Sequence, residues 1–304
     1  MVGNEASEQA QANWTHVVAF GNQKGGVGKT TNTVHVAAAL GEMGRRVLVI
    51  DLDMNAGATK HFGIKGEGFL GTFEVLTGAE QPMDVVLRDG EEDVRLPRNV
   101  DLISSCRKLE QIDQVLLSKN KFAPLQDILL GPIRTLRGRY DYVFLDTAPN
   151  ATSPTIAAYK AADWFVLTAM PEPFAIAGLN EALMDIRDAQ QHGNANLRLL
   201  GLILCAVDKR TKLANDLKTY CHDAFSPDGQ TSAKFDTTIS RSTVVGQTQE
   251  ARKTLFQTHS KHEVTEQYRA LARELEARVR APQARNNSAG ALPAAPQMKE
   301  AENG

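Results

Sequence analysis

The sequence predicts an α/β fold, a single doubly wound and mostly parallel sheet with helices on both faces. Short apolar runs typical of buried strands alternate with helix-like stretches along the chain. Two of these runs lead into aspartates and a third leads into a glycine-rich loop, as expected where ligands bind at the carboxyl edge of such a sheet. With 304 residues, 42% of them hydrophobic, the chain can bury one good-sized core, and the alternation leaves no gap for a second domain.

The first motif is the glycine-rich loop, residues 23–30, with the sequence QKGGVGKT. The common phosphate-binding loop has the pattern G-x-x-x-x-G-K-[ST]; Gly28, Lys29 and Thr30 match its end, while Gln23 takes the place of its first glycine. Glycines let backbone N–H groups turn toward phosphate oxygens, Lys29 can reach the β and γ phosphates, and the Thr30 hydroxyl is placed for Mg²⁺. The expected ATP-binding residues of this loop are Lys24, Gly25, Gly26, Val27, Gly28, Lys29, Thr30 and Thr31.

The loop has the sequence context that its chemistry requires. Residues 16–20 form a short apolar run typical of a buried strand, and residues 30–40 are rich in Ala and Val without Gly or Pro. The second run predicts the helix whose N-terminus faces the phosphates. Gly41 and Gly44 are expected to end this helix. Strand, loop and helix therefore follow one another in the required order.

Two carboxylates follow the next predicted strand, residues 46–50. This strand delivers Asp51 and Asp53 at its carboxyl edge, and the period of two along an extended chain puts both side chains on the same side. One carboxylate can then help to hold the Mg²⁺ shell while the other orients an attacking water. In isolation, a D-x-D at a strand end is as well explained by a turn or a helix cap.

A third acidic element comes later in the chain. The apolar run 140–145 leads into Asp146-Thr147-Ala148-Pro149, the expected form of a Walker B strand. The Asp146 carboxylate can accept a hydrogen bond from a Mg²⁺-bound water, which suits a hard cation that keeps much of its hydration shell. The three elements together predict an ATP and Mg²⁺ site at one edge of the sheet.

Lys24 lies five residues before the loop lysine, where most such loops carry no charge. It cannot easily fold back onto the same phosphates, and we expect it to project toward a nucleotide held by another subunit. Here the sequence resembles the ParA/MinD superfamily of deviant Walker ATPases, closest to the short, Soj-like ParA proteins of DNA partition. In that family the signature lysine crosses an ATP-sandwiched dimer interface. The resemblance extends over roughly residues 17–278.

The resemblance implies a slow, Mg²⁺-dependent ATPase with ATP and Mg²⁺ as cofactors. The implied catalytic residues are Lys24, Lys29 and Asp53, with Asp53 assigned to hydrolysis. The implied metal-site residues are Thr30, Asp51 and Asp146. The family usually continues the second motif with Pro-Gln, whereas this chain has Met54-Asn55, a departure that bears on the hydrolysis rate and on the response to a partner.

Segments beyond the third motif extend the resemblance: residues 165–168, 202–208 and 239–241 and a predicted helix over 263–280. In the resembling fold the ends of the last two strands flank the base of the nucleotide. Asp208 and Arg241 are therefore candidate adenine contacts, although a simple strand-to-loop transition explains both positions equally well.

The net charge of −2 does not mark the whole chain as a nucleic-acid binder. Between residues 205 and 262, however, nine Lys and Arg residues face six Asp and Glu residues. A mixed solvated face would account for this excess, but the resemblance implies DNA binding without sequence preference through basic residues of this region. The candidate DNA-binding residues are Lys209, Arg210, Lys212, Arg241, Arg252 and Lys253.

Membrane association is not expected. No apolar run approaches 18 residues, and the chain begins with no signal peptide. Relatives of the MinD type end in a basic amphipathic helix, whereas here the stripe of the last helix is expected to pack on the core; it consists of Val264, Tyr268, Leu271, Leu275 and Val279. Three cysteines without a C-x-x-C pair fit a reducing cytosol and disfavour the iron–sulfur relatives on this fold.

The predicted organisation has three parts: a flexible arm over residues 1–14, a ParA-like ATPase domain over 15–280 and a disordered tail over 281–304. The arm is too short for the DNA-reading helix-turn-helix domain of larger relatives. The tail is rich in Ala, Pro, Asn, Ser and Gly and has no aromatic residue, so it cannot bury enough apolar surface to order itself.

The resemblance implies an ATP-dependent homodimer that binds non-specific DNA, works with a ParB-like centromere-binding protein and segregates plasmid or chromosome in the cytoplasm, on the nucleoid. Three alternatives share the motifs. They are a MinD-like membrane-cycling ATPase, an orphan ParA-like protein that positions a non-DNA cargo, and a metabolic ATP-dependent synthetase or amidoligase.

Overall fold

The computed structural model describes residues 14–64, 68–91, 94–173, 175–224 and 233–281. The expected arm, apart from Trp14, and the expected tail, apart from Ala281, lie outside these residues. The strands are β1 (His16–Gly21), β2 (Val47–Asp51), β3 (Val100–Ile103), β4 (Tyr142–Asp146), β5 (Trp164–Ala169) and β6 (Arg198–Leu204). The α-helices are α2 (Lys29–Glu42), α3 (Gly57–His61), α4 (Thr72–Thr77), α5 (Ile112–Lys119), α6 (Leu130–Leu136), α7 (Ser153–Ala161), α8 (Ala175–His192), α9 (Lys212–Ala224), α10 (Thr243–Glu250), α11 (Leu255–Thr258) and α12 (Glu263–Arg280).

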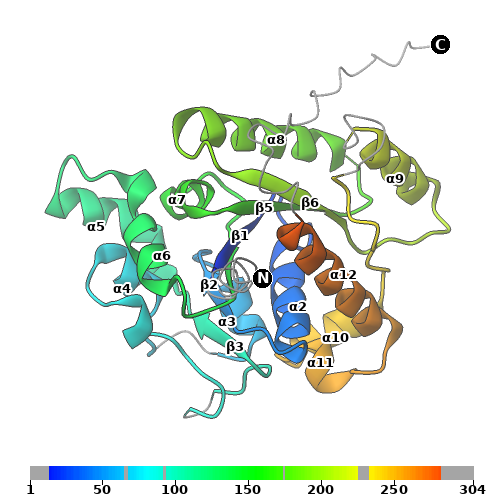
Figure 1. The fold of residues 1–304 in the computed structure, drawn as a ribbon, viewed down its shortest axis with the longest axis horizontal. Coiled ribbons are helices and arrows are strands. Elements are labelled where there is room, and N and C mark those ends of the chain that lie inside the picture. Colours follow the sequence, from blue (N-terminus) through cyan, green and yellow to red (C-terminus); the bar gives the residue numbers. More distant parts are fainter. Residues whose placement is uncertain (1–13, 65–67, 92–93, 174, 225–232, 282–304) are drawn as a thin grey trace, which may run out of the picture.

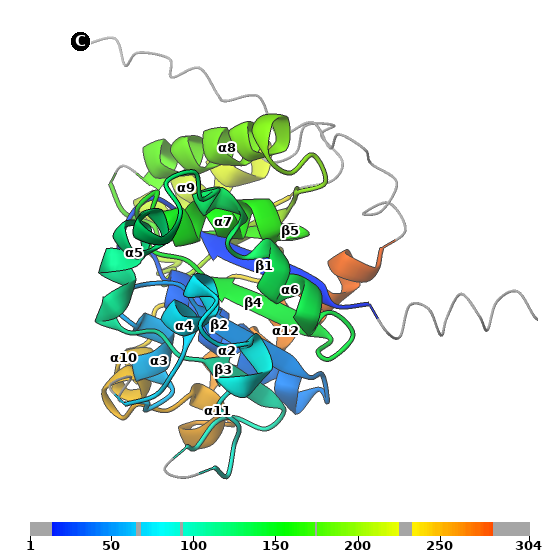
Figure 2. The same ribbon diagram turned by 90° about the vertical axis from the view of Figure 1, so that its left-hand side faces the viewer.

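The six strands form one sheet in the order β3-β2-β4-β1-β5-β6, and every neighbouring pair is parallel. Figure 2 shows the strands from β5 to β3 following one another in this order. β1, which carries the glycine-rich loop, lies centrally between β4 and β5. The predicted doubly wound α/β fold is confirmed.

Helices cover both faces of the sheet (Figure 1). Side chains of α4 to α9 pack into one hydrophobic cluster, and side chains of α2, α3, α11 and α12 pack into the other. The central strand shows why both faces are apolar: Val17 and Ala19 belong to the first cluster, and Val18 and Phe20 to the second. Successive side chains of a strand point to opposite faces, so a strand covered on both sides becomes a continuous apolar run.

The predicted stripe on the last helix is confirmed as a core face. Its five residues are each at most 2% exposed and lie in the same cluster as the apolar side chains of α2. α12 and α2 lie side by side (Figure 1). No helix within the described residues is both long and apolar enough to cross a membrane.

Two element boundaries differ from the predictions. Gly41 lies inside α2 rather than ending it, and glycine is needed there because a Cβ would come within 2.2 Å of the Arg98 carbonyl oxygen. The left-handed turn comes at Gly44, with φ +84°. β6 ends at Leu204, and the expected strand around residue 239 appears as an isolated parallel bridge between Val207 and Ser240.

Candidate nucleotide and magnesium site

The glycine-rich loop joins β1 to the N-terminus of α2 and contains two residues in the left-handed region. Gly26 has φ +76° and Gly28 has φ +87°, conformations that glycine adopts without a steric penalty. At Gly28 a Cβ would also lie 2.8 Å from the Cys205 sulfur. The backbone path of the loop therefore requires glycine, as the motif predicted.

Asn22, which the sequence analysis did not single out, fixes the start of the loop. Its side chain is buried; Nδ2 donates to the Thr168 carbonyl oxygen at 2.8 Å, and Oδ1 accepts from the Lys24 backbone N–H at 2.9 Å. One amide side chain thus ties the loop to the end of β5. Because both hydrogen bonds are satisfied, burial of this polar group carries no large penalty.

Lys29 lies inside the loop rather than in solvent. Its ammonium donates to the Lys24 carbonyl oxygen at 3.0 Å, and the residue is 7% exposed. Burial lowers the pKa of Lys29, while the carboxylates of Asp146 and Asp53 act in the opposite direction. A cation held in this position can exchange a backbone oxygen for an anionic phosphate oxygen, which forms a stronger, charge-assisted hydrogen bond.

Asp146 has hydrogen-bond partners that place it at the centre of the predicted magnesium site, which consists of Thr30, Asp51 and Asp146. One of its oxygens accepts from the Thr30 hydroxyl at 2.8 Å and the other lies 3.1 Å from the Thr33 hydroxyl. The register of β2 and β4 places Asp51 directly beside it. Burial, followed by the charge of Asp51, raises the pKa of Asp146 to about 8. Two buried carboxylates and a threonine hydroxyl form an oxygen donor set that a hard divalent cation fits, and such a cation would relieve their mutual repulsion.

Asp51 is fully buried and holds the following segment. One carboxylate oxygen accepts from both the backbone N–H and the hydroxyl of Thr59, each at 2.8 Å, and the other accepts from the Asp53 N–H. Burial raises its pKa to about 6. The side chain therefore anchors α3 and Asp53, in addition to its place beside Asp146.

Asp53 faces the nucleotide cavity, but one of its oxygens is already engaged. Oδ1 accepts from the Asn55 backbone N–H at 2.8 Å and from the Asn55 side-chain amide at 3.0 Å. Ala56 follows in the left-handed region, with φ +52°. The Met54-Asn55 departure from the family pattern thus has a structural consequence, because Asn55 restrains the carboxylate that was predicted to orient water.

A cavity of about 550 Å³ joins these groups, within the range of small-molecule sites. The predicted residues that line it are Gly25, Gly26, Gly28, Lys29, Thr30, Thr31, Asp53 and Arg241. The predicted metal-site residues Asp51 and Asp146 are not among the lining residues, and neither are three of the predicted ATP-binding residues. Val27 is buried and accepts from the Cys205 sulfur through its carbonyl oxygen, Asp208 forms an ion pair with Arg210 outside the cavity, and Lys24 turns away.

Lys24 makes an ion pair within its own chain. Its ammonium lies 2.8 Å from a carboxylate oxygen of Glu172 and 3.3 Å from the Pro173 carbonyl oxygen. The side chains of Lys24 and Glu172 are 33% and 47% exposed. The signature lysine is therefore directed away from the phosphate loop of its own subunit, and it is accessible from outside.

α10 closes the far side of the cavity, which no motif predicted. Val245, Gly246 and Gln249 line it, and the Gln249 amide donates to the Thr31 hydroxyl at 2.8 Å. Ser240 also lines this end. The cavity thus continues from the phosphate loop to the segment where the base was expected.

Comparisons with known proteins identify the family. A family model described as an AAA domain (AAA_31) matches residues 15–199, more than half of the chain. The chromosome-partitioning ATPase Soj of Thermus thermophilus is 30% identical over 263 residues, covering 86% of this chain and 96% of that protein. The chain belongs to the ParA/MinD superfamily of ATPases. This ParA-type chain is also 28% identical over 269 residues to the chromosome partitioning protein ParA of Myxococcus xanthus, covering 88% of this chain and 90% of that protein.

A solved relative of this ParA-type ATPase carries both expected cofactors. Cobyrinic acid a,c-diamide synthase from Mycobacterium smegmatis, with bound ATP analogue and magnesium, has a TM-score of 0.73 and 28% identity. The match covers 88% of this chain and 96% of that one. Its ligands agree with the expectation of ATP and Mg²⁺ as cofactors.

The six cations predicted to bind DNA are all exposed in the ParA-type fold. Lys209 and Arg210 lie in the turn before α9, and Lys212 begins that helix. Arg252 and Lys253 follow α10, with Arg252 in the left-handed region at φ +53°. Arg252 and Lys253 thus follow a helix that lines the nucleotide cavity, and Arg241 lines the cavity itself.

Proposed function

We propose that this protein is a partition ATPase that cycles between a monomer and an ATP-sandwiched homodimer. The dimer binds DNA without sequence preference, a ParB-like partner stimulates hydrolysis, and the cycle segregates plasmid or chromosome on the nucleoid in the cytoplasm. Residues 15–280 form the ATPase domain. The observation that carries the proposal is the direction of Lys24, which leaves its own phosphate loop and ends on an exposed carboxylate.

Nucleotide binding uses the amides of the glycine-rich loop, the Lys29 ammonium and the Thr30 hydroxyl. The Lys29 ammonium, which now donates to the Lys24 carbonyl oxygen, would bind β and γ phosphate oxygens, and the loop amides would hold the phosphate chain. The Thr30 hydroxyl, which now donates to Asp146, would be a ligand of the cation. Mg²⁺, when bound, neutralises charge on the phosphates. Asp146 would hold a Mg²⁺-bound water through its carboxylate, and Asp51 would support Asp146 from β2.

Hydrolysis rests on Asp53, which lines the cavity from the segment between the end of β2 and the beginning of α3. Its free carboxylate oxygen accepts a hydrogen bond from a water molecule and orients that water toward the γ phosphorus of ATP. Because Asn55 holds the other oxygen, the residue has limited freedom, and basal turnover is slow. A partner that reshapes this segment would speed the reaction.

Dimerisation requires Lys24 to exchange Glu172 for the phosphates of the facing subunit. An ion pair between half-exposed side chains contributes only about 0–1 kcal/mol. A phosphate group carries more negative charge than the Glu172 carboxylate, and an interface between subunits excludes more water than the exposed surface around Glu172. Lys24 is therefore expected to bind the phosphates more strongly than Glu172 once ATP is present. The dimer then depends on nucleotide without any large rearrangement of the sheet.

DNA binding by the dimer rests on the six exposed cations described above, four of which lie next to α9 or α10 and one, Arg241, in the cavity wall. Affinity should fall with salt with a log–log slope of roughly −0.9 per phosphate contact. Retardation of two unrelated duplexes, with and without ATP, tests this step. Arg252→Glu and Lys253→Glu should reduce affinity and slope, whereas Lys119→Glu on α5 should not; binding that is unaffected by ATP would count against the proposal.

The proposal is tested by nucleotide-dependent dimerisation of the full chain, measured by light scattering with a non-hydrolysable ATP analogue. Wild type should double its mass, and Lys24→Ala should bind the analogue yet stay monomeric, because Lys29 and Thr30 remain. Lys119→Ala removes an exposed lysine elsewhere and should dimerise normally. Dimerisation of Lys24→Ala at the wild-type concentration would rule out the interface role.

A second candidate is a metabolic ligase, favoured by the 28% identity to the cobyrinic acid a,c-diamide synthase. Such an enzyme would activate a carboxylate with ATP and would not need DNA. Failure to retard DNA in any nucleotide state, together with ATP turnover that depends on an added small carboxylic acid, would replace the partition proposal with this one.

A further inference from the structure

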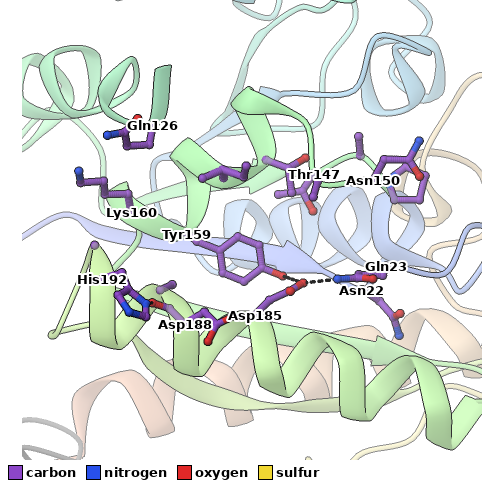
Figure 3. A pocket seen from close by; sticks show the side chains of 17 residues that line it. Asn22, Gln23, Gln126, Thr147, Asn150, Tyr159, Lys160, Asp185, Asp188 and His192 are labelled. Carbon is purple, nitrogen blue, oxygen red and sulfur yellow. Dashed lines mark hydrogen bonds between the residues drawn. The ribbon is translucent and has the colours of Figure 1, made fainter. Parts of the chain in front are cut away.

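A second cavity, of about 400 Å³, lies between α7 and α8 beside the start of the phosphate loop (Figure 3). Residues 147–151, which follow the Walker B strand, form one wall, and Asn22 and Gln23 form another. Pro149 also lines the nucleotide cavity, so the two spaces are neighbours with different walls. Neither the motifs nor the proposed nucleotide chemistry uses this second space.

Its polar groups converge on Asp185, on α8. The Gln23 side-chain amide donates to this carboxylate at 2.7 Å, and the Tyr159 hydroxyl lies 3.4 Å from the same oxygen (Figure 3). Tyr159 is only 7% exposed. Asp188, one turn further along α8, lines the cavity as well, and within the described part of the chain its carboxylate accepts no side-chain hydrogen bond. Two carboxylates of one helix face thus border the same space.

The basic groups of the cavity are already engaged. The ammonium of Lys160 forms an ion pair with Asp127, and Nδ1 of His192 bonds the Asp188 backbone carbonyl oxygen at 3.0 Å. A bound anion would therefore meet Asp185 and Asp188 with little compensation. A cation would meet two carboxylate groups and a phenolic oxygen. The charges of the lining residues therefore favour a cationic ligand over an anionic one.

The remaining wall is apolar. Ala148, Pro149, Ala151 and Ala189 line it, and Ile156 lies at the rim with 45% of its surface exposed. A ligand that covers this exposed apolar surface removes it from water, which favours binding. The occupant that fits has a cationic head and a short apolar stem.

We propose that this cavity is a second ligand site that takes an alkyl guanidinium or ammonium group. The head lies between Asp185 and Asp188 with Tyr159 as a further oxygen partner, and the stem lies along Ile156 and Pro149. A planar guanidinium has several N–H donors and can bond two carboxylates at once. The same head group occurs in free amines and in the basic side chains of polypeptides.

Occupation of the site acts on the phosphate loop through Gln23. The ligand head and the Gln23 amide compete for the same carboxylate oxygen of Asp185. A bound cation therefore releases Gln23, which adjoins Asn22 and Lys24. This competition predicts two opposite effects on ligand affinity. Removing the Gln23 amide should strengthen ligand binding, whereas removing the Asp185 charge should weaken it.

The test is titration of the nucleotide-free full chain with agmatine, followed by ligand-observed NMR, so that the outcome is independent of ATP hydrolysis and dimerisation. Wild type should bind saturably. Asp185→Asn and Asp188→Asn should each weaken binding about tenfold, since each loses a charge-assisted hydrogen bond. Gln23→Ala should tighten it several-fold, and Asp113→Asn, an exposed acid on α5, should leave it unchanged.

A blocked tripeptide with a central arginine, titrated in the same way, distinguishes the two sources of the head group. Tighter binding of the peptide identifies a polypeptide side chain as the ligand, and tighter binding of agmatine identifies a free amine. Absence of binding by both probes, or equal binding by wild type and by both folded aspartate variants, would overturn the proposal.

Discussion

The hydroxyl of Thr30 donates a hydrogen bond of 2.8 Å to Asp146, a carboxylate that is fully buried beside a second buried carboxylate, Asp51. Without a cation, ionising both carboxyls would place two negative charges together in a low-dielectric environment, and the pKa values of both are accordingly raised. The fold tolerates it because the same oxygens are the ones that a Mg²⁺–nucleotide complex needs. Stability and nucleotide binding therefore oppose each other at this residue.

At alkaline pH, where Asp146 is ionised, Asp146→Asn should stabilise the nucleotide-free protein by about 1–3 kcal/mol, since the amide keeps the hydrogen bond from Thr30 and removes a buried charge. It should lose the extra stability that wild type gains from Mg²⁺ and ADP. Denaturant unfolding with and without Mg²⁺–ADP measures both effects. Asp113→Asn, an exposed carboxylate, serves as the control and should change neither value. A destabilised Asp146→Asn that still responds to Mg²⁺ would contradict this account.

Glu172→Gln should strengthen the ATP-dependent dimer by up to roughly thirtyfold, because it frees the Lys24 of each subunit from an ion pair worth at most about 1 kcal/mol. Sedimentation at several protein concentrations gives the dimer dissociation constant. Glu110→Gln breaks another exposed ion pair, with Arg107, and should leave the constant unchanged. A weaker dimer in Glu172→Gln would mean that Glu172 itself contributes to the interface.

Asn55→Ala should raise basal turnover by roughly two- to tenfold, since the Asp53 carboxylate loses one of the hydrogen bonds that hold it away from water. The change should appear in kcat with little effect on KM for ATP. Met54→Ala alters the neighbouring exposed side chain and should have no effect. A lower kcat in Asn55→Ala would show that Asn55 orients Asp53 productively.

Two buried histidines should make the protein acid-sensitive. Burial lowers the pKa of His35 to about 3 and that of His61 to about 4, whereas each takes up a proton near pH 6.5 when unfolded. The unfolded state then binds more protons below pH 6.5, so stability falls as pH falls through this range. Asp51 and Asp146, with raised pKa values, act in the opposite direction.

A comparison of wild type with His61→Leu separates the histidine from the carboxylates, which are common to both proteins. Between pH 6 and 5, the free energy of unfolding of wild type should fall by about 1.2 kcal/mol more than that of the variant, since the unfolded histidine is mostly but not fully protonated in this range. Urea unfolding at three pH values measures the difference. Parallel curves for the two proteins would show that His61 is not kept neutral by the fold.

The sequence predicted those features that depend on local pattern. The apolar runs that end in Asp51 and Asp146, the glycine spacing of the loop and the stripe on α12 are all set by residues a few positions apart, and each appears where expected. Gly41 was wrongly expected to end a helix, because its role depends on the carbonyl of Arg98, which lies far along the chain.

Long-range partners could not be predicted. Glu172 lies 148 residues from Lys24, and Gln249 lies 218 residues from Thr31, so no local period connects either pair. The side chain of Asn55 looked like a simple departure from the family pattern, and only the turn geometry reveals its bond to Asp53. The loop chemistry was thus predictable, while the groups that restrain it required the fold.

The most direct measurement of the central claim mixes two inactive variants. Lys24→Ala keeps its own Asp53 but offers no lysine to its partner, and Asp53→Ala offers Lys24 but cannot orient water. If Lys24 acts across the interface, equal mixing should raise ATP turnover clearly above that of either variant alone, since each mixed dimer contains one Lys24 facing an intact Asp53 and so holds one complete site. If Lys24 acts within its own subunit, the mixture should stay as inactive as the separate variants, which would contradict the account.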